Sequence, residues 1–374
     1  MKPAQFLRPL PDRRTLNGRL TRLISGAFSR LHPATGGCGI CWHRPLPLSL
    51  RLAPAPNPAF PVDIVYTWVD GTDPEHSARR ALYLPEHQHA AHKDGLLRGR
   101  FRDNEELRYS LRALELYAPW ANRVIIVTDR QKPNWLNANH PKIRIVDHTE
   151  CIPEAYLPTF NSHVIEAHLH RIEGLSEHYI YINDDIFLGR PCEKSHFFMA
   201  NGLPLAYVDW RARRVFGYRF TKTPHALSYF NTLALLRERG IATDPGFVTA
   251  HGPFAQTRSN ARDTYSFFEA ELQTFCHNRF RTTAEMAFYC HALPLLQYSK
   301  KRLVPCDECY YYVQARRHDR IAYYKAILQS RREGAAPLFF CINDAGKSTS
   351  PRWREDLRQL LASYYPTPSQ FEKG

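Results

Sequence analysis

Four aspartates stand at the ends of apolar segments, and these are the side chains of the sequence that could do chemistry. They are Asp70, the adjacent pair Asp184-Asp185, and Asp344. Carboxylates at the end of a strand can hold a hard divalent cation, and that cation can neutralise a diphosphate. An isolated Asp-Asp pair is more often a solvated turn that caps a neighbouring helix. The recurrence of the arrangement after three separate segments favours the cation site.

Patterns around these aspartates predict the elements that position them. Ile64–Val69 is β-branched and aromatic and stops at the turn Asp70-Gly71, as a strand does. Asp103 and Glu106 have the spacing of a capping box, which predicts a helix with Asp103 as its N-cap. The other expected elements are strands at 124–127, 143–146, 179–182 and 338–342, and helices at 162–173, 266–276, 283–292 and 354–363.

The alternation of strands and helices predicts the fold class. It favours an α/β protein with a doubly wound, mainly parallel, Rossmann-like sheet. Ligands bind such sheets beyond the carboxyl ends of the strands, where the acidic turns after Val69 and Ile182 would meet. The stretch 191–300 alternates less regularly and is expected to be a helical insertion or a second lobe. Tyr310–Tyr312 is expected to be a packed strand edge.

The charge distribution separates a basic arm from a body. The chain has 374 residues, 44% of them hydrophobic and 23% charged, which excludes a disordered, collagen-like or coiled-coil protein. Residues 1–61 are rich in proline and carry +8 of the net charge of +14, so we predict an N-terminal arm there and a catalytic domain at 62–374. A basic amphipathic pattern at 16–31 favours contact with an anionic membrane, with packing on the body or a disordered leader as alternatives.

Cysteine use and hydropathy predict a cytoplasmic protein. Five cysteines stand singly in apolar surroundings, as buried free thiols do: Cys151, Cys192, Cys276, Cys290 and Cys341. The sequence has neither an apolar run long enough to span a membrane nor a signal-peptide pattern, so we expect no span and no secretion. The Cys-x-x-Cys pairs at 38–41 and 306–309 are too far apart to favour one zinc site. No pattern typical of a nucleic-acid-binding module is present.

Three long motifs resemble a known family. DIVYTWVDGTDPE (63–75), FRDNEELRYSLRALELYAPW (101–120) and LPTFNSHVIEAHLHRIEGLSEHYIYINDD (157–185) closely resemble the first two conserved regions of the Stealth family. AHGPFA (250–255) with RTTAEMAFY (281–289) resembles the third region, and FCIND (340–344) with YPTPSQFE (365–372) resembles the fourth. The regions span about 62–76, 98–190, 215–295 and 338–372. The resemblance implies a GT-A-like version of the expected sheet.

The family contains bacterial capsule hexose-1-phosphate polymerases and the catalytic subunit of the animal GlcNAc-1-phosphotransferase. The resemblance therefore implies transfer of a hexose-1-phosphate, with an N-acetylhexosamine as the expected sugar, from a UDP-sugar to a sugar hydroxyl. UMP would be released and a phosphodiester formed, in capsule or exopolysaccharide synthesis. The alternatives are a Leloir-type glycosyltransferase that releases UDP and a non-catalytic membrane- or polyanion-binding protein. The expected partners are a nucleotide-sugar donor, a glycan acceptor and, peripherally, the cytoplasmic face of the inner membrane, with no nucleic acid.

The resemblance also implies roles for single residues. Asp185 would be the general base, with Asp184 and Asp344 as ligands of Mg²⁺ or Mn²⁺, although the division of roles between the two adjacent aspartates stays open. His251 and Arg281 would contact the transferred phosphate; taken alone, they would be a structural histidine and a surface ion pair. The residues expected to bind the donor are Trp68, Asp70, Gly71, Arg102, Asp103, Asn104 and Asn183.

Two further features refine these expectations. His163, His168 and His170 would not face a common metal on one helix, so packing or polar support is expected of them. Only 65 residues lie between Asp185 and His251, whereas the animal enzymes carry long insertions there. A compact bacterial enzyme that acts on glycans, rather than on protein acceptors, is therefore expected, and a processive polymerase is less firmly implied than the transfer chemistry.

Overall fold

The computed structural model describes residues 57–87, 91–209, 222–241, 247–297, 303–306, 310–315, 319–344 and 352–373. Nearly all of the predicted arm lies outside these residues, and so do its amphipathic pattern, three of the four Cys-x-x-Cys cysteines and the start of the expected third region. The last residues of the predicted arm contact the body. Phe60 stacks on the His178 ring with 3.6 Å between ring centroids.

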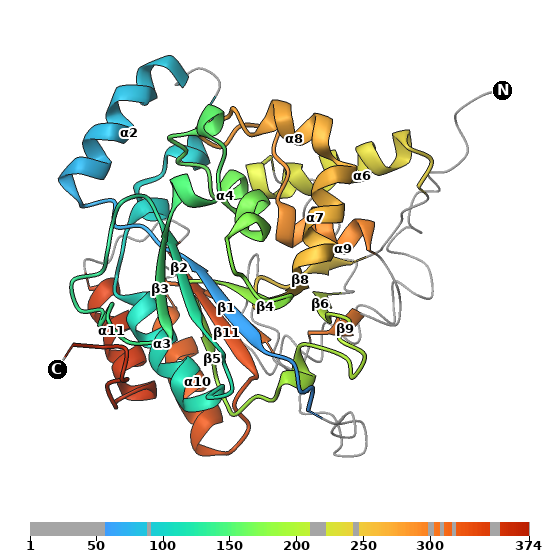
Figure 1. Cartoon of the computed structure of the whole chain (residues 1–374). Coiled ribbons are helices and arrows are strands. Elements are labelled where there is room, and N and C mark those ends of the chain that lie inside the picture. Colours follow the sequence, from blue (N-terminus) through green and yellow to red (C-terminus); the bar gives the residue numbers. More distant parts are fainter. Residues whose placement is uncertain are drawn as a thin grey trace, which may run out of the picture. The chain divides into compact units, whose positions relative to one another are not determined.

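The central element is a five-stranded sheet in the order β3-β2-β1-β4-β8 (Figure 1). β1 to β4 pair in parallel, and β8 runs antiparallel to β4. The prediction of a mainly parallel α/β sheet is therefore confirmed. The strands are β1 (Val62–Thr67), β2 (Val124–Thr128), β3 (Ile143–Asp147), β4 (His178–Asn183) and β8 (Phe254–Thr257).

Helices cover both faces of this sheet, which explains why its strands are apolar on both sides. Val65 of β1 belongs to a core cluster that contains Val164 of helix α4. Its neighbour Tyr66 points to the opposite face, since side chains alternate along a strand. The Tyr66 hydroxyl lies 2.9 Å from Ser110 Oγ of helix α3, which packs on that second face.

Two three-stranded sheets flank the central one. β10 and β11 are parallel, and β5 pairs antiparallel with β11. The second small sheet has the order β7-β6-β9. Their strands are β5 (Ile186–Leu188), β10 (Tyr310–Gln314), β11 (Phe339–Asn343), β6 (Ala206–Asp209), β7 (Val248–Thr249) and β9 (Leu303–Pro305). β10 is the edge of its sheet, as expected of Tyr310–Tyr312.

Helices α3, α4 and α11 fall where the sequence predicts helices, whereas the three longest helices, α2, α6 and α10, were not predicted. The α-helices are α2 (Pro74–His87), α3 (Glu106–Tyr117), α4 (Ser162–His168), α6 (Pro224–Glu238), α7 (Arg258–Phe267), α8 (Glu269–Phe275), α9 (Leu293–Leu296), α10 (Arg320–Arg332) and α11 (Trp353–Tyr364). The 3₁₀ helices are η2 (Lys93–Leu96), η3 (Arg98–Phe101), η4 (His148–Glu150), η5 (Glu154–Tyr156), η6 (Leu169–Arg171) and η7 (Lys194–His196). A π-helix, η8 (Phe288–Ala292), precedes α9.

Three predictions about helices are wrong. The helix expected at 266–276 is two helices that meet at Phe268, which is fully buried. The helix expected at 283–292 starts only at Phe288, because Glu285 turns its carboxylate back to accept a hydrogen bond from Thr282 N. The third is the capping box, since the N-cap of α3 is Glu105, in the left-handed region with φ 69° and without a side-chain cap.

The residues of the predicted capping box make other contacts. Asp103 Oδ1 accepts a hydrogen bond from Glu105 N at 2.8 Å. Glu106 accepts from Asn104 instead, through both the backbone N and the side-chain Nδ2, each at 2.6 Å. Both carboxylates are thus held in the turn before α3. A non-glycine residue with positive φ is a local strain of the kind that occurs at functional sites.

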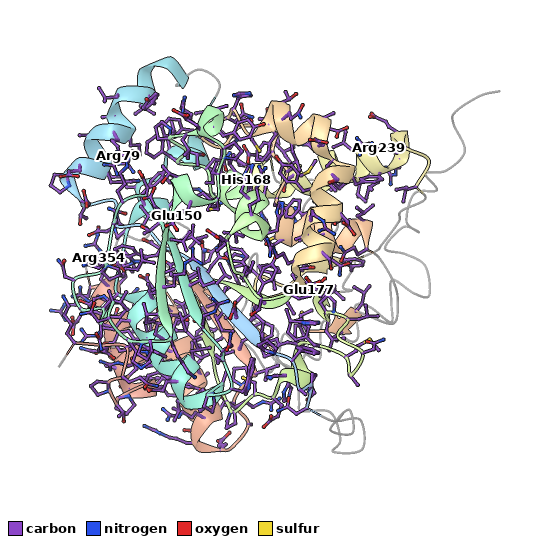
Figure 2. The ribbon with its side chains drawn as sticks, viewed as in Figure 1. Arg79, Glu150, His168, Glu177, Arg239 and Arg354 are labelled. Carbon is purple, nitrogen blue, oxygen red and sulfur yellow. The ribbon has the colours of Figure 1, made fainter. Side chains whose placement is uncertain are left out.

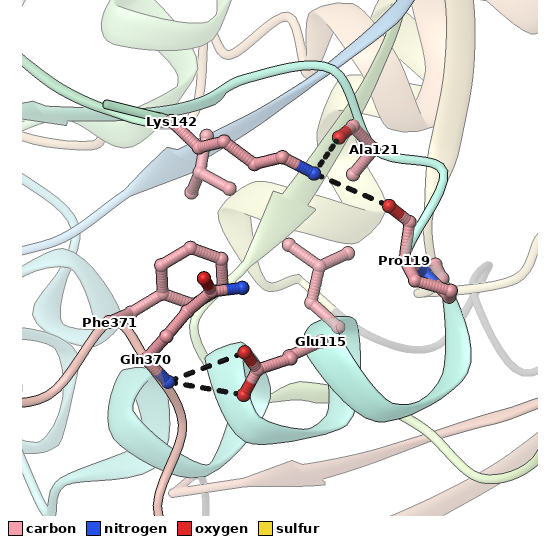
Figure 3. A pocket seen from close by; sticks show the side chains of 9 residues that line it. Glu115, Pro119, Ala121, Lys142, Gln370 and Phe371 are labelled. Atoms are coloured by element: carbon pink, nitrogen blue, oxygen red, sulfur yellow. Dashed lines mark hydrogen bonds between the residues drawn. The ribbon is translucent and has the colours of Figure 1, made fainter. Parts of the chain in front are cut away.

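The C-terminal segment docks at the amino ends of β2 and β3, on the sheet edge opposite the acidic turns. A small pocket there is lined by Lys142, Glu115 and Phe371, among others (Figure 3). Glu115 accepts hydrogen bonds from Gln370 N, and Lys142 Nζ donates to the Ala121 carbonyl at 2.8 Å. This pocket holds the C-terminal segment. It lies at the opposite ends of the strands from the candidate catalytic residues.

Two predictions on the cysteines and the membrane can be compared with the described residues. The five cysteines expected to be buried free thiols are free and buried, and so is Cys306. Within the part of the chain that the structure describes, no helix is both long enough and apolar enough to cross a bilayer.

Candidate active site

Asp184 and Asp185 form the link between the central sheet and the β10-β11-β5 sheet. They lie between the end of β4 and the start of β5. The Asp185 carbonyl accepts from Ile342 N at 3.0 Å, which joins this link to β11. Asp185 Oδ2 accepts from Asn343 Nδ2 at 2.9 Å and lies 3.4 Å from Cys341 Sγ. The predicted convergence of strand ends is therefore present, and it holds the Asp185 carboxylate in one orientation.

His251 reaches the same carboxylate from the loop between β7 and β8. Its Nε2 lies 3.7 Å from Asp185 Oδ1. The next residue, Gly252, makes this approach possible, because a Cβ there would lie only 2.2 Å from a ring carbon of Phe339 on β11. The structure thus brings together Asp185 and His251, which the sequence analysis assigned to the same site.

The carboxylates around Asp184 repel one another. Burial, and then Asp185 and Glu106, raise the pKa of Asp184 well above its ordinary value. Burial also raises the pKa of Glu106 to about 8 and that of Asp103 to about 6, with like charges adding to both shifts. Such repulsion among carboxylates is relieved by a bound cation.

The donor atoms present fit a hard cation. Asp185 Oδ1 is buried and has no hydrogen-bond partner among the residues that the structure describes. Burial opposes ionisation of Asp185, but His251 and the hydrogen bonds from Asn343 and Cys341 lower its pKa, so this carboxylate is an anion. Cys341 lies close enough to Asp185 and His251 to share an ion with them. Burial raises the pKa of its thiol well above the usual range, however, so the carboxylates are the ligands that suit Mg²⁺ or Mn²⁺.

Asp344, predicted to be a metal ligand, is joined to another predicted residue. Its Oδ2 accepts a charge-assisted hydrogen bond from Arg102 Nη1 at 2.7 Å, and the Arg102 guanidinium also lies over the Trp353 ring. Arg102 and Asp344 come from opposite ends of the domain sequence. The ion pair neutralises Asp344, which makes it a weaker candidate for a cation ligand than Asp184 or Asp185.

The residues expected to bind the donor gather at the end of β1, and several have structural partners. Asp70 Oδ1 accepts from Thr72 N and Thr72 Oγ1, and its charge adds to the raised pKa of Asp103. Gly71 N donates to the Phe101 carbonyl at 2.5 Å, and a Cβ on Gly71 would lie 2.3 Å from that oxygen. The close contact seats η3 against the end of β1.

Three other expected donor-binding residues flank this turn. Asn183 pairs in register with Thr67, so it ends β4 beside the end of β1. Asn104 Oδ1 and Trp68 Nε1 are buried and have no hydrogen-bond partner among the described residues. Unpaired buried polar atoms are costly, so a polar ligand in this place would satisfy them.

Arg281 lies beside a second arginine that the sequence analysis did not single out. The Arg281 guanidinium is the main cause of the lowered pKa of Arg100 on η3, about 9. Arg281 Nη2 donates to Ser162 Oγ, and Arg100 Nε donates to the Asp94 carbonyl. Among the described residues, no carboxylate lies within ion-pair distance of either guanidinium. Two neighbouring cations without a counter-ion are an arrangement that favours a bound anion, and the arginine-rich RGRFR at 98–102 was the signal for it.

Glu166 is a second residue that sequence reasoning missed. It is buried in α4, and Arg281 and His251 both act on its charge, so it lies between the two residues expected to contact phosphate. Burial raises its pKa to about 7, and its Oε2 has no hydrogen-bond partner within the described ranges. Its place in FNSHVIE gave no spacing signal of its own.

The three histidines near α4 have different surroundings. His168 Nδ1 bonds to the Val164 carbonyl, and His168 and His170 each contact the Tyr265 ring, as expected of packing residues (Figure 2 labels His168). His163 differs, because its Nδ1 lies 2.6 Å from Glu285 Oε2 and both side chains are almost fully buried.

Comparison with known proteins identifies the family of the chain. Family models match residues 60–88 (Stealth protein CR1, conserved region 1), 100–206 (CR2, conserved region 2) and 326–374 (CR4, conserved region 4). The capsular polysaccharide phosphotransferase LcbA of Aeromonas hydrophila is 36% identical over 317 residues, which are 83% of this chain and 85% of the relative. The chain belongs to the Stealth family. The matched Stealth regions contain Arg100, Asp184 and Asp185, whereas His251 and Arg281 lie between them.

Other Stealth relatives share the same kind of name. The capsular polysaccharide phosphotransferase fcs1 of Haemophilus influenzae is 35% identical, covering 83% of this chain and 85% of the relative. The exopolysaccharide phosphotransferase SCO6023 of Streptomyces coelicolor is 39% identical, covering 84% of this chain and 53% of the relative. The protein is therefore an enzyme, which sets aside the non-catalytic alternative.

Solved structures with some likeness to the chain include the galactosyltransferase LgtC with donor and acceptor sugar analogs and mouse xyloside xylosyltransferase 1. The first has 10% identity and a TM-score of 0.40 and covers 83% of this chain and 98% of that chain. The second has 12% identity and a TM-score of 0.36, covering 76% and 98%. Scores this low add nothing to the assignment.

Proposed function

We propose that the protein transfers a hexose-1-phosphate from a UDP-sugar to a sugar hydroxyl and releases UMP, in the synthesis of a capsular or extracellular polysaccharide. The observation that supports the proposal is that a Stealth protein holds a cluster of buried carboxyls and two neighbouring arginines, Arg100 and Arg281, in one domain. An N-acetylhexosamine is the proposed sugar, and an oligosaccharide or polysaccharide the proposed acceptor. The names of the relatives support this class of substrates.

Asp184 and Asp185 would hold Mg²⁺ or Mn²⁺. Such a cation supplies positive charge to the diphosphate of the donor, which stabilises the leaving UMP. The unpartnered Asp185 Oδ1 and the mutual repulsion of Asp184, Glu106 and Asp103 support this role. We revise the expected role of Asp344, because its ion pair with Arg102 makes it a positioning partner for that arginine.

Arg281 and Arg100 would hold the transferred phosphate, with His251 beside it. Guanidinium groups match the geometry of phosphoryl oxygens and spread the charge of the transition state. His251 and Arg281 both act on Glu166, which supports a common site for them. The attacking hydroxyl and the departing UMP would then lie on opposite sides of a phosphorus held in place by these cations.

We also revise the expected role of Asp185 as general base. Its Oδ2 is occupied by Asn343 and Cys341, and its pKa is lowered, so it is a weak proton acceptor and a good anionic ligand. Peripheral contact with the cytoplasmic face of the inner membrane through the basic arm is part of the proposal. The concentration of positive charge at 1–61 supports it.

The test is an Asp185→Asn variant assayed by UMP release with a panel of UDP-sugars, an oligosaccharide acceptor and Mg²⁺. Turnover should fall at least about a thousandfold, since removing one charged ligand weakens metal binding and transition-state stabilisation together. The melting temperature should fall only slightly, because the Asn side chain still offers an oxygen to Asn343 Nδ2 although a charge that the folded state favours is lost. Asp263→Asn, on the exposed surface of α7, is the control and should behave as wild type. A fully active Asp185→Asn enzyme would overturn the site.

A further inference from the structure

His163 and Glu285 form a buried pair that the proposed chemistry has not yet used. His163 Nδ1 and Glu285 Oε2 lie 2.6 Å apart, and their side chains are 3% and 0% exposed. His163 comes from the first turn of α4, and Glu285 from the segment before η8, more than 100 residues later. The two residues are far apart in the sequence but in close contact in the fold. A buried polar contact this short suggests a role other than packing.

The hydrogen bonds around Glu285 determine which ring nitrogen of His163 carries the proton. Asn161 Nδ2 donates to both carboxylate oxygens at 3.2 Å, and Thr282 N donates to Oε1 at 2.6 Å. These donors favour the ionised form of the Glu285 carboxylate. The ionised carboxylate then also accepts a hydrogen bond from His163 Nδ1–H. That assignment leaves a lone pair on Nε2.

His163 Nε2 has no hydrogen-bond partner among the described residues. The ring lies next to the arginine pair, because burial and then Arg281 and Arg100 lower its pKa well below the ordinary value. Ser162, its neighbour in the chain, accepts the hydrogen bond from Arg281 Nη2. A neutral imidazole with a free lone pair therefore stands beside the place proposed for the transferred phosphate.

We propose that His163, oriented by Glu285, takes the proton from the attacking acceptor hydroxyl. In this step the hydroxyl oxygen forms a bond to the phosphorus of the sugar-1-phosphate. The bond from that phosphorus to the oxygen of UMP breaks, and UMP leaves with the bonding electron pair. The hydroxyl proton moves to Nε2, and the imidazolium that forms is stabilised by the Glu285 carboxylate, as in other carboxylate–histidine pairs. This step rests on the proposed function.

The pair should give the reaction an acidic limb in its pH profile. Burial raises the pKa of Glu285 to about 7, and protonation there would put a hydrogen on the oxygen facing Nδ1 and shift the ring proton to Nε2. Activity should therefore be present above about pH 7 and be lost below it. Arg281 and Arg100 also act on His163, and the pKa of Arg100 is about 9. Burial lowers the pKa of His225 and that of His291, the latter to about 3, so both rings stay neutral between pH 6 and 8.

The experiment measures UMP release from pH 6 to 9 by wild type, His163→Gln and Glu285→Gln, with the UDP-N-acetylhexosamine and oligosaccharide that the wild type uses. His163→Gln should lower kcat by 10² to 10⁴, the usual effect of losing a general base, and should abolish the acidic limb. Glu285→Gln should lower kcat by about tenfold or more, because the amide no longer stabilises the imidazolium. Affinity for the donor alone, measured by calorimetry, should change less than twofold.

Two matched variants separate catalysis from packing. His168→Gln removes another buried histidine of α4 and should leave the profile unchanged. Glu166→Gln removes the other group with a pKa of about 7 and should keep the limb. A limb that persists in His163→Gln and disappears in Glu166→Gln would overturn the proposal, as would UMP release by His163→Gln within tenfold of wild type. Release of UDP by the wild type would instead overturn the proposed function, and this step with it.

Discussion

At the scale of single residues, the unusual feature is two neighbouring arginines, Arg100 and Arg281, that have no carboxylate within ion-pair distance in the described part of the chain. Arg281 is the main cause of the lowered pKa of Arg100, and the opposing effects of Asp94 and Glu285 are smaller. Like charges in contact destabilise a fold unless an anion bridges them. The pair is thus a site whose stability should depend on a bound phosphate.

Arg100→Ala tests this dependence. In the wild type, inorganic phosphate at about 10 mM should raise the melting temperature, because it binds the folded protein between the two guanidiniums. In Arg100→Ala that rise should disappear, while the melting temperature without phosphate should not fall. Arg98→Ala, which changes an exposed arginine two residues away, is the control and should keep the rise. Equal protection of Arg100→Ala and wild type would contradict an anion site at this pair.

At the scale of elements, the ends of strands position the site, and glycines allow the connecting loops to approach. Gly71 illustrates this, because η3 rests on it and carries Arg100. A Cβ on Gly71 would overlap the Phe101 carbonyl, so either the turn after β1 or η3 must move.

Gly71→Ala should therefore disturb catalysis more than stability. We expect destabilisation of about 1–3 kcal/mol, the usual cost of an overpacked contact, measured by urea unfolding. Turnover should fall at least tenfold, because misplacing a phosphate-binding group by even 1 Å is costly. Leu97→Ala, whose side chain is 49% exposed just before η3, should change neither quantity. Wild-type turnover in Gly71→Ala would show that the close contact between Gly71 and the Phe101 carbonyl is not needed to position η3.

The elements also show how far the sequence could predict the molecule. The four parallel strands of the central sheet, β1 to β4, were predicted within about two residues, since their apolar runs are buried on both faces, whereas the antiparallel edge strand β8 was missed. The aspartates at the strand ends were found for the same reason. The prediction of a helix at 283–292 was wrong. The Glu285 side chain accepts a hydrogen bond from Asn161, which is 124 residues away in the sequence.

The missed site residues have the same cause. Arg100, Glu166 and the His163–Glu285 pair are distinguished only by neighbours that are distant in sequence. Hydrophobic periodicity and motif spacing carry no information about such long-range contacts. The expected capping box failed for a different reason, because the turn before α3 adopts another local geometry. The placing of the predicted arm, residues 1–61, stays a prediction.

At the scale of the whole molecule, the C-terminal segment is tied to helix α3. Glu372 is almost buried, and its carboxylate accepts from Arg112 Nε at 2.6 Å and from Arg108 Nε. Burial alone would raise the pKa of Glu372, but these two arginines and Ser369 N lower it to about 2. The Glu372 carboxylate thus holds the C-terminal segment on α3, together with the hydrogen bonds from Gln370 N to Glu115.

Glu372→Gln should destabilise the protein by about 2 kcal/mol at pH 7, since it leaves two guanidiniums without their counter-ion. The folded pKa is depressed, so the wild-type contribution is complete above about pH 4.5 and is lost as the pH falls toward 2. The difference between variant and wild type in urea unfolding should therefore shrink as the pH falls below 4.5. Glu115→Gln, at the exposed end of the same seat, is the control. A difference independent of pH would contradict the assignment.

The measurement that tests the central claim most directly is the identity of the nucleotide released. The purified protein would be incubated with Mg²⁺, UDP-sugars and short capsule-type oligosaccharides, and the products separated by chromatography. UMP with a new sugar phosphodiester is the predicted result, because attack at phosphorus carries the phosphate away with the sugar. UDP with a new glycosidic bond would mean attack at the anomeric carbon, as in a Leloir-type glycosyltransferase, and would contradict the account.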